Sequence, residues 1–478
     1  MATAFQINMT GAQQVPGVAS TAVSYGFALF NPASTELEYG FLTVGLDFGS
    51  YFGIGAQTVA TTDDVIDAHF HSGLAGENGG VVFNWKSQDS DDFDGGLVSG
   101  IAGTAFTGGR WELTDPASTS LSTFAATLGA ATIGQDVGLY ANIHTIANPV
   151  GEIRGQLIGA ATDAGEAING TTGPDLLIGL NGADTINGLG GLDIVWYGSD
   201  QTVGGTAGVY VDLQSGFAQD GFGNYDILTG IVGAVGSDRM RVPGLSDVMI
   251  GDANGNFFAG NDGLDYIVGN GGNDTIMTGG GDAGVVGDIA VAGAGNDYVE
   301  GEGGATFAYG GAGSDFLTDI GGGNDWLFGG DFSGTVTGTD TMLGGAGNDV
   351  LAVGSAGGNA SMSGGTGNDT IYGGSGAAGN DTIIGGAGSD YMYGGSGGND
   401  VYRFETADIV NGDFDTLLGF NAGDTLSFAA SLNGVIFGQQ TTINGTSGAY
   451  LSTASGWALW MPFATWAGGV QSQVTYTG

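Results

Sequence analysis

Short apolar triplets alternate with glycine-rich turns throughout the middle of the chain. In "GGAGNDVLA" (344–352), a six-residue turn ends in an aspartate and is followed by an apolar triplet. Successive side chains of a strand point to opposite faces, so the middle residue of each triplet faces one side alone. The middle residues Leu327, Ile371, Ile383 and Met392 are therefore expected to fill a thin core. Two such units are predicted to form one coil of a flattened, right-handed parallel solenoid, a β-roll.

Aspartates end most of these turns and recur every nine or ten residues. Those in register are Asp175, Asp184, Asp193, Asp238, Asp247, Asp265, Asp274, Asp288, Asp297, Asp315, Asp325, Asp340, Asp349, Asp369, Asp381, Asp390 and Asp400. Thr306 and Asn359 are predicted to occupy intermediate register positions, and insertions near 194–232, 275–282 and 329–335 interrupt the period. Glycines let turn carbonyls converge, and aspartate adds an anionic oxygen. Such oxygens suit calcium, which takes six to eight of them at about 2.3–2.6 Å.

The regions on either side of the repeats have a different pattern. Residues 1–158 contain short runs rich in Val, Ile, Phe and Tyr separated by turn residues, which predicts an antiparallel β-sandwich or barrel. The repeats occupy 159–400, with a strand-rich insert near 194–232. Residues 401–478 are predicted to be β-rich and carry no charge after Asp424. The whole chain is thus expected to be all-β, with three regions.

Net charge supports the assignment of calcium. The chain has 50 acidic and 6 basic residues, a formal charge of −44, which excludes affinity for nucleic acid or anionic membranes. Stacked aspartates would repel one another unless cations lay between them. We therefore expect the array to be largely unfolded without calcium and to fold on binding it. The absence of cysteine excludes disulfides and thiolate metal sites.

The three histidines, His69, His71 and His144, all lie in the N-terminal region. His69 and His71 share a face of their strand. If the strand of His144 is adjacent, the three imidazoles could bind zinc or copper. The alternative is that they hydrogen-bond strand ends and turns. Arg154 is expected to pair with a carboxylate such as Glu152 or Asp67.

The nine-residue unit resembles the RTX nonapeptide, G-G-x-G-x-D-x-U-x, the hemolysin-type calcium-binding repeat. Good copies are "GGAGSDFLT" (310–318), "GGTGNDTIY" (364–372) and "GGAGSDYMY" (385–393). The resemblance implies a calcium-bound β-roll. It also implies type I secretion from a Gram-negative cell through an uncleaved C-terminal signal, in keeping with the lack of a cleavable N-terminal signal. The copies at 242–250 and 251–259 depart from the pattern, and Asn256 replaces the aspartate in the second.

The N-terminal region resembles the CHRD (chordin-type) domain. The matching stretches are "MTGAQQVPGVAST" (9–21), "DAHFHSG" (67–73) and "GLYANIHTIANPVGEIRGQL" (138–157). Gln14 stands where the family usually has glutamate. The family brings no enzymatic activity to this chain.

Several functional classes can be weighed from these features. No H-E-x-x-H motif is present, "GGSGG" (394–398) lies inside the repeats, and no segment resembles a catalytic domain. A pore-forming toxin would need an amphipathic region ahead of the repeats, where a β-sandwich is expected instead. We therefore predict a non-enzymatic extracellular protein that assembles with itself into a filament or surface layer.

The alternatives are a monomeric adhesin or matrix binder, which could recognise cell-surface polysaccharide, and a secreted hydrolase. Trp457, Trp460 and Trp466 would form either an assembly contact or the core of the C-terminal region. No membrane span is expected, because no run of about 18 apolar residues occurs.

Overall fold

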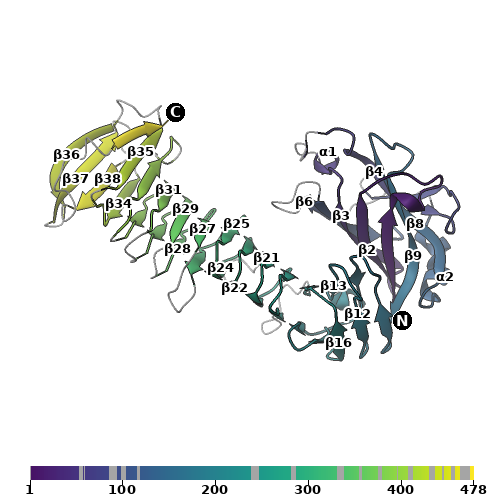
Figure 1. Cartoon of the computed structure of the whole chain (residues 1–478). Helices are drawn as coiled ribbons and strands as arrows, with labels where there is room; N and C mark the ends of the chain where they lie inside the picture. Colours follow the sequence, from purple (N-terminus) through teal and green to yellow (C-terminus); the bar gives the residue numbers. More distant parts are fainter. Residues whose placement is uncertain are drawn as a thin grey trace. The chain divides into compact units, whose positions relative to one another are not determined.

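The structure is a computed structural model of the whole chain. It describes residues 2–52, 58, 60–85, 94–97, 104–115, 119–237, 247–280, 287–330, 338–354, 358–374, 379–395, 397–406, 408, 413–421, 423–429, 436–443, 446–453, 458–462 and 474–477. Two compact units are present, one of residues 1–207 with 216–234 and the other of residues 208–215 with 235–478. Strands dominate both units (Figure 1).

The first unit begins with one nine-stranded sheet. Its strands are β1 (Thr3–Thr10), β2 (Val23–Asn31), β3 (Glu36–Val44), β4 (Val65–Ser72), β5 (Val81–Asn84), β6 (Asp94–Leu97), β7 (Thr104–Trp111), β8 (Asp136–Thr145) and β9 (Ile153–Thr162). They lie in the order β5-β4-β8-β9-β1-β2-β3-β7-β6, and all neighbours pair antiparallel. The sheet curls into a near-barrel, which confirms the predicted antiparallel fold. Short helices α1 (Gly49–Phe52) and α2 (Ala125–Gly129) accompany it.

Aromatic side chains fill the near-barrel. Phe41 stacks on Trp85 with ring centroids 4.5 Å apart, and Phe83 stacks on Trp111 at 5.1 Å. All four side chains are fully buried. Large aromatic surfaces contribute most of the hydrophobic free energy of such a core. The strands are therefore held by a dense centre, and residues that alternate with the core positions lie on the outer face.

A parallel β-solenoid of about 11 turns follows, as predicted. Its strands in the first unit are β10 (Ala167–Asn169), β11 (Leu176–Leu177), β12 (Thr185–Asn187), β13 (Ile194–Trp196), β15 (Phe217–Gln219) and β16 (Tyr225–Thr229), with β17 (Gly233–Val235) at the unit boundary. β15 pairs antiparallel with β16, unlike the parallel neighbours around them. This hairpin is the strand-rich insert that the sequence indicates near 194–232.

The second unit continues the solenoid. Its strands are β14 (Tyr210–Asp212), β18 (Val248–Ile250), β19 (Phe257–Ala259), β20 (Tyr266–Gly271), β21 (Thr275–Gly280), β22 (Asp288–Ala294), β23 (Tyr298–Glu302), β24 (Thr306–Ala312), β25 (Phe316–Asp319), β26 (Trp326–Gly330), β27 (Thr339–Leu343), β28 (Val350–Ala352), β29 (Asn359–Thr366), β30 (Thr370–Tyr372), β31 (Thr382–Ala387), β32 (Tyr391–Tyr393), β33 (Val401–Phe404), β34 (Phe414–Leu418) and β35 (Thr425–Ala429). Even-numbered strands from β18 to β34 stack in one sheet, and odd-numbered strands from β19 to β35 stack in the other. Each coil thus contributes one strand to each sheet.

The strand triplets behave as predicted. β28 spans the predicted residues Val350–Ala352, and its middle residue Leu351 is fully buried. Leu327, Ile371, Ile383 and Met392 are also fully buried, which confirms the thin core. In these triplets the middle side chain fills the space between the sheets and its two neighbours face outward, whereas longer strands such as β33 and β35 bury two apolar side chains.

The C-terminal region closes with antiparallel strands. β36 (Ile436–Ile443), β37 (Thr446–Thr453) and β38 (Ala458–Pro462) form a meander, and β39 (Val474–Thr477) pairs parallel with β35. Trp460 on β38 is buried within the chain. It therefore belongs to the region's own core, whereas Trp457 and Trp466 lie outside the described residues. No helix in the described part of the chain is long and apolar enough to cross a membrane.

Within the first unit, the near-barrel covers the first coil of the solenoid. Gln6 Nε2 and Asn8 Nδ2 of β1 donate to Asp175 Oδ1 at 2.5 and 2.9 Å. Phe27 packs on Trp196 at 4.7 Å, and Ser199 donates to Glu38. A solenoid needs a cap at each end, and the near-barrel supplies one.

Truncating a core residue should weaken the solenoid far more than truncating its exposed neighbour. Ile371→Ala in saturating calcium should cost about 2–5 kcal/mol, because it leaves a cavity between the sheets. Tyr372→Ala, at a side chain that is 40 % exposed, should change stability by about 0.5 kcal/mol or less. Urea unfolding followed by circular dichroism measures both. Equal losses for the two variants would contradict a core made from the middle residues.

Candidate metal centres

The aspartates of the turns form two hydrogen-bonded ladders along the solenoid. In one ladder the backbone N–H of each aspartate donates to Oδ1 of the aspartate one coil later, as from Asp349 to Asp369 and from Asp369 to Asp390, at 2.8 and 2.9 Å. The other ladder repeats the pattern, for example from Asp381 to Asp400 at 3.0 Å. The turn that ends each repeat is thereby tied to the next coil.

Coil length varies while the ladder geometry stays constant. Bonded aspartates are 18 residues apart between Asp297 and Asp315 but 25 apart between Asp315 and Asp340. The corresponding N···O distances are 3.0 and 3.1 Å. Extra residues are therefore accommodated without breaking the ladder.

The second carboxylate oxygen of most ladder aspartates has no partner. These side chains are at most 4 % exposed, and their Oδ2 atoms are buried without a hydrogen bond. The residues are Asp184, Asp193, Asp265, Asp274, Asp297, Asp315, Asp325, Asp340, Asp349, Asp369, Asp381, Asp390 and Asp400. A buried anionic oxygen without a partner is costly, so the fold requires a proton or a cation beside it.

The space around each free oxygen is bounded by glycine backbone. A Cβ atom on Gly344 would lie 2.5 Å from Asp349 Oδ2 and 2.6 Å from the Gly364 carbonyl oxygen. Gly347, in the same turn, has a φ of +153°. Hard carboxylate and carbonyl oxygens are the ligands that calcium prefers. The free Oδ2 atoms and the turn carbonyls therefore fit calcium.

Burial raises the pKa of these carboxyl groups. The pKa of Asp349 is raised to about 8, first by desolvation and then by the charges of Asp325 and Asp369. Desolvation also raises the pKa of Asp315 to about 7 and that of Asp340 to about 6. Without metal, several ladder carboxyls therefore hold protons near neutral pH, and a bound cation must displace them.

Some predicted positions differ from the common pattern. Asp175 accepts from Gln6 and Asn8 and, through Oδ2, from the Thr171 backbone. Asp247 accepts from Ser237 through both carboxylate oxygens. Both aspartates are buried but already satisfied by donors. Asp288 accepts the Asp265 N–H as a regular ladder member, and Asp238 lies outside the described residues.

Some ladder positions hold a residue other than aspartate. Thr306 occupies its predicted position and donates its N–H to Asp325. The prediction for Asn359 is wrong by one residue, because Ala360 pairs with Asp340 and donates to Asp381. Asn256 fills its ladder position with an amide and donates its N–H to Asp274.

Sequence reasoning missed further ladder members. Asp226, Asp415 and Asp424 accept the N–H groups of Asp184, Asp390 and Asp400. Asp226 follows the insert, which conceals its register. Asp415 and Asp424 lie beyond the last good repeat, and the shortened G-D-x-U pattern of "AGDTLSF" is the sequence signal for Asp424.

A second row of side chains runs beside the aspartates. Asn348, Asn368 and Ser389 precede ladder aspartates, and each donates its N–H to the asparagine Oδ1 one coil earlier. The recurring "ND" and "SD" dipeptides are the sequence signal for this row. It stabilises coil stacking with neutral groups on the exposed side.

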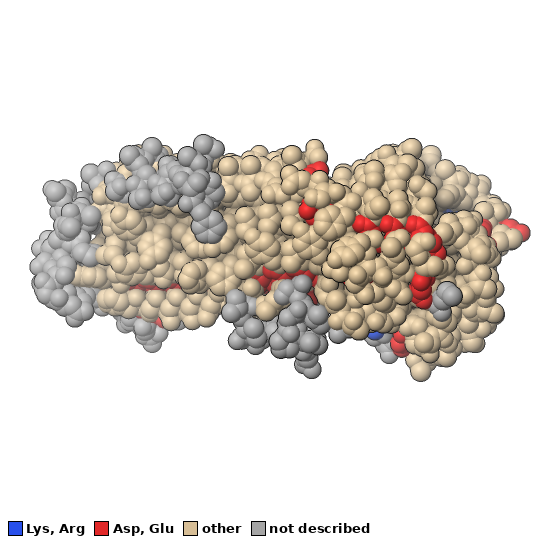
Figure 2. All heavy atoms as spheres, turned by 90° about the horizontal axis from the view of Figure 1, so that it is seen from below, with Lys and Arg blue, Asp and Glu red and all other residues tan. Residues whose placement is uncertain are grey.

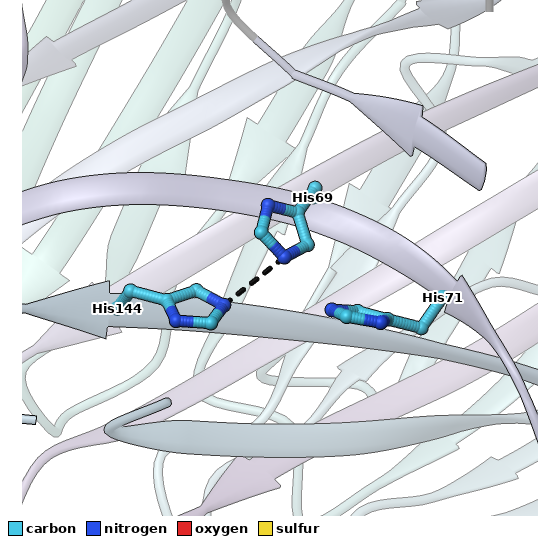
Figure 3. Close-up of side chains that lie close together, drawn as sticks. All are labelled: His69, His71 and His144. Carbon is cyan, nitrogen blue, oxygen red and sulfur yellow. Dashed lines mark hydrogen bonds between the residues drawn. The ribbon is translucent and has the colours of Figure 1, made fainter. Parts of the chain in front are cut away.

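The three histidines meet in the near-barrel. His69 on β4 and His144 on β8 lie on adjacent paired strands, which meets the condition for a shared metal site, and their Nε2 atoms are 3.0 Å apart. His71 lies beside them, and one nitrogen of each residue lies within 4.8 Å of the others (Figure 3). Burial lowers the pKa of His71 to about 4 and also lowers that of His144. The cluster could therefore offer neutral imidazoles to a metal.

The prediction that Arg154 pairs with Glu152 or Asp67 is wrong. Its guanidinium donates to the backbone carbonyls of Glu77 and Leu74 at 2.7 and 3.2 Å. Glu152 instead accepts from Thr145 and Asn148. Arg154 therefore fastens the loop between β4 and β5, a long-range contact that the sequence does not reveal.

Comparison with known families identifies both parts of the chain. Residues 5–157 match the CHRD domain. The RTX calcium-binding nonapeptide repeat matches 163–202, 250–285, 283–317, 321–336, 335–355, 355–377 and 375–401. A search of curated proteins finds no match. RTX repeats bind calcium and are typical of secreted proteins.

Neutralising one ladder aspartate should weaken calcium binding. Asp369→Asn keeps the Oδ1 acceptor for the Asp349 N–H but removes the anionic Oδ2. The calcium concentration at the folding midpoint should rise at least about tenfold, since even indirect perturbation of a metal site costs that much. Calcium titration followed by circular dichroism measures the midpoint. Asp212→Asn is the matched control, because Asp212 lies outside the ladders and its Oδ1 accepts a local hydrogen bond from the Ser215 N–H. This variant should leave the calcium midpoint unchanged.

Raising the pH should have opposite effects on the metal-free and calcium-bound solenoid. The ladder carboxyls have folded pKa values above the ordinary aspartate value, so the metal-free fold is favoured at low pH. It should lose stability as pH rises through about 6–8. Calcium binding should strengthen over the same range and release protons. Thermal melts in chelator at pH 6 and 8 measure the first effect and a pH-stat the second; a metal-free fold that gains stability with pH would contradict the mechanism.

Proposed function

We propose that this chain, an array of RTX calcium-binding repeats behind a CHRD domain, is a non-enzymatic extracellular structural protein. It folds on binding calcium and then assembles with further copies of itself into a filament or surface layer. The observation that carries the proposal is the recurrence, along both ladders, of buried aspartate Oδ2 atoms without a hydrogen-bond partner. An array built in this way makes calcium part of the fold.

Calcium dependence suits a protein that folds after export. Calcium is scarce in the cytoplasm and plentiful outside the cell, so the solenoid would remain unfolded until the chain has left the cell. We infer release from a Gram-negative cell by type I secretion, in keeping with the family of the repeats. The ladder carboxylates act as structural ligands in this proposal and assign no catalysis to the chain.

One outer face of the second-unit solenoid is apolar along its length. On the even-numbered strands, each buried middle residue is flanked by two outward side chains that stack in register from coil to coil. One row contains Tyr266, Ile289, Phe307, Trp326, Val350, Thr370, Tyr391 and Thr416. The other row contains Val268, Val291, Tyr309, Phe328, Ala352, Tyr372, Tyr393 and Leu418. We call these two rows the aromatic face.

The opposite sheet carries a more polar exterior. Its outward positions include Ser361, Ser363, Thr382 and Thr425, and also the charged Arg403. The aromatic face has no charged residue, and Trp326 on it is 45 % exposed. Contiguous exposed apolar surface of this kind marks an interaction site. The two sides of the solenoid therefore differ in what they can bind.

A second copy of the same chain is the partner that this face fits best. Each chain carries a formal charge of −44, so two copies repel each other. They can therefore associate best through a surface that has no carboxylates. The ladder aspartates are buried, and on the face drawn in Figure 2 most of the visible acidic atoms lie in short rows. Both copies also present the same coil repeat, so their side-chain rows match in spacing.

Disrupting the aromatic face should block assembly without unfolding the solenoid. In millimolar calcium the wild-type protein should form filaments or sheets, which a chelator should dissolve. The double variant Trp326→Ser/Tyr391→Ser should remain monomeric, because it interrupts the apolar row at two coils. Sedimentation velocity and negative-stain microscopy measure assembly, and circular dichroism in calcium verifies the fold.

Leu343→Ser is the matched control, since Leu343 is a 36 % exposed apolar residue on the opposite sheet. This variant should assemble like the wild type. Folded single particles of wild type at every concentration in calcium would overturn self-assembly. The function would then be that of a monomeric adhesin or matrix binder, and a glycan screen would follow.

A further inference from the structure

We propose that His69, His71 and His144 bind one divalent transition-metal ion, zinc or copper, through their Nε2 atoms. This site is separate from the calcium ladders and lies in the CHRD domain. Its ligands come from the neighbouring strands β4 and β8. The proposal is independent of self-assembly.

The three histidines lie on the outer face of the sheet, opposite the core. Ala68 and Phe70, which alternate with them on β4, are fully buried in the aromatic core. Ile143, next to His144 on β8, is also a core residue. His69 and His144 are nevertheless only 5 % and 8 % exposed. The histidine cluster is therefore buried outside the aromatic core, at a place where packing of that core does not require polar side chains.

Each Nδ1 atom faces an oxygen. His71 Nδ1 is 3.0 Å from the Gly79 carbonyl, and His144 Nδ1 is 3.1 Å from the Pro149 carbonyl. His69 Nδ1 lies 3.3 Å from Asp67 Oδ2. A carbonyl oxygen can only accept, so the facing Nδ1 must carry the proton, and a neutral imidazole then has its lone pair on Nε2. Outer oxygens that fix the tautomer in this way are typical of histidine metal ligands.

The Nε2 atoms converge on one point (Figure 3). The Nε2 atoms of His69 and His144 lie at hydrogen-bonding distance, 3.0 Å apart, and His71 Nε2 is buried without a partner. A proton could bridge His69 and His144 but would leave His71 unsatisfied. One metal ion would satisfy all three. Nitrogen atoms that share a tetrahedral zinc at about 2.0–2.1 Å lie about 3.3 Å apart, close to the separation of the first pair.

The surroundings hold His71 in place. Tyr140 stacks on its ring with centroids 4.7 Å apart and planes at 3°, and the Arg154 guanidinium lies over the Tyr140 ring, 3.4 Å from its centroid. Arg154 also binds the carbonyls of Leu74 and Glu77, in the loop that supplies Gly79. Arg154 is therefore a positioning residue: it fixes both the ring that packs on His71 and the loop that orients its Nδ1.

The donor set selects the class of metal. Three imidazoles suit zinc and copper, whereas calcium requires oxygen ligands. The two kinds of site can therefore be loaded independently. Three protein ligands leave one coordination position for water or another small ligand.

The test uses the full chain in millimolar calcium, freed of other metals with a chelator selective for transition metals. Titration with zinc, and separately with copper(II), should show one saturable site by calorimetry, and elemental analysis should give about one ion per chain. The copper form should show nitrogen hyperfine structure in its electron paramagnetic resonance spectrum. His71→Ala should abolish the saturable site, and Asp67→Asn should weaken it about 10- to 100-fold.

Ser72→Ala, next to His71 on β4, is the control and should bind like the wild type. Near-ultraviolet circular dichroism of the buried tryptophans verifies folding, and His71→Gln replaces His71→Ala if the latter misfolds. Absence of a saturable site for either metal in the wild type would overturn the proposal in favour of a proton-bridged histidine pair. Undiminished binding in folded His71→Ala or His71→Gln would overturn it as well, since the site would then lie elsewhere.

Discussion

Mutual repulsion of buried carboxylates is the constraint on which the repeat array depends. Stacking one coil on the next brings aspartates such as Asp349, Asp369 and Asp390 into a buried row. A peptide N–H partly offsets the charge on each Oδ1, but the Oδ2 atoms of these three aspartates have no hydrogen-bond partner among the described residues. In a low-dielectric interior, like charges at this spacing strongly disfavour the compact state. A proton or a cation such as calcium must therefore neutralise each of these oxygens, a role that the apolar core between the sheets cannot fill.

At the start of the array, the N-terminal domain supplies the donors that an earlier coil would otherwise supply. Asp175 meets the amide groups of Gln6 and Asn8 in place of a further coil. These neutral donors satisfy an oxygen without adding charge. The near-barrel is built around its own aromatic core, and side chains of β1 cover the first coil of the array.

How much the sequence predicts depends on how local the signal is. The period of glycine and aspartate identified the solenoid, its core residues and most ladder members, because each coil repeats a local rule. Asp226 was missed because the insert separates it from Asp184, and Ala360 because its register position lacks a side-chain signal. The contacts of Arg154 join segments about 80 residues apart. Convergence of the histidines was foreseen only as a possibility, since strand pairing decides it.

The constancy of the ladder across coils of unequal length has a practical consequence. Ladder bonds of 2.8–3.1 Å join aspartates that are 18, 20 or 25 residues apart in the second unit. The bond fixes where each coil begins, and the remaining chain is free to lengthen between fixed points. Such an architecture can gain or lose peptide segments within single coils during evolution while the hydrogen bonds between coils are kept. In protein engineering, foreign loops could therefore be inserted at regular intervals along the solenoid.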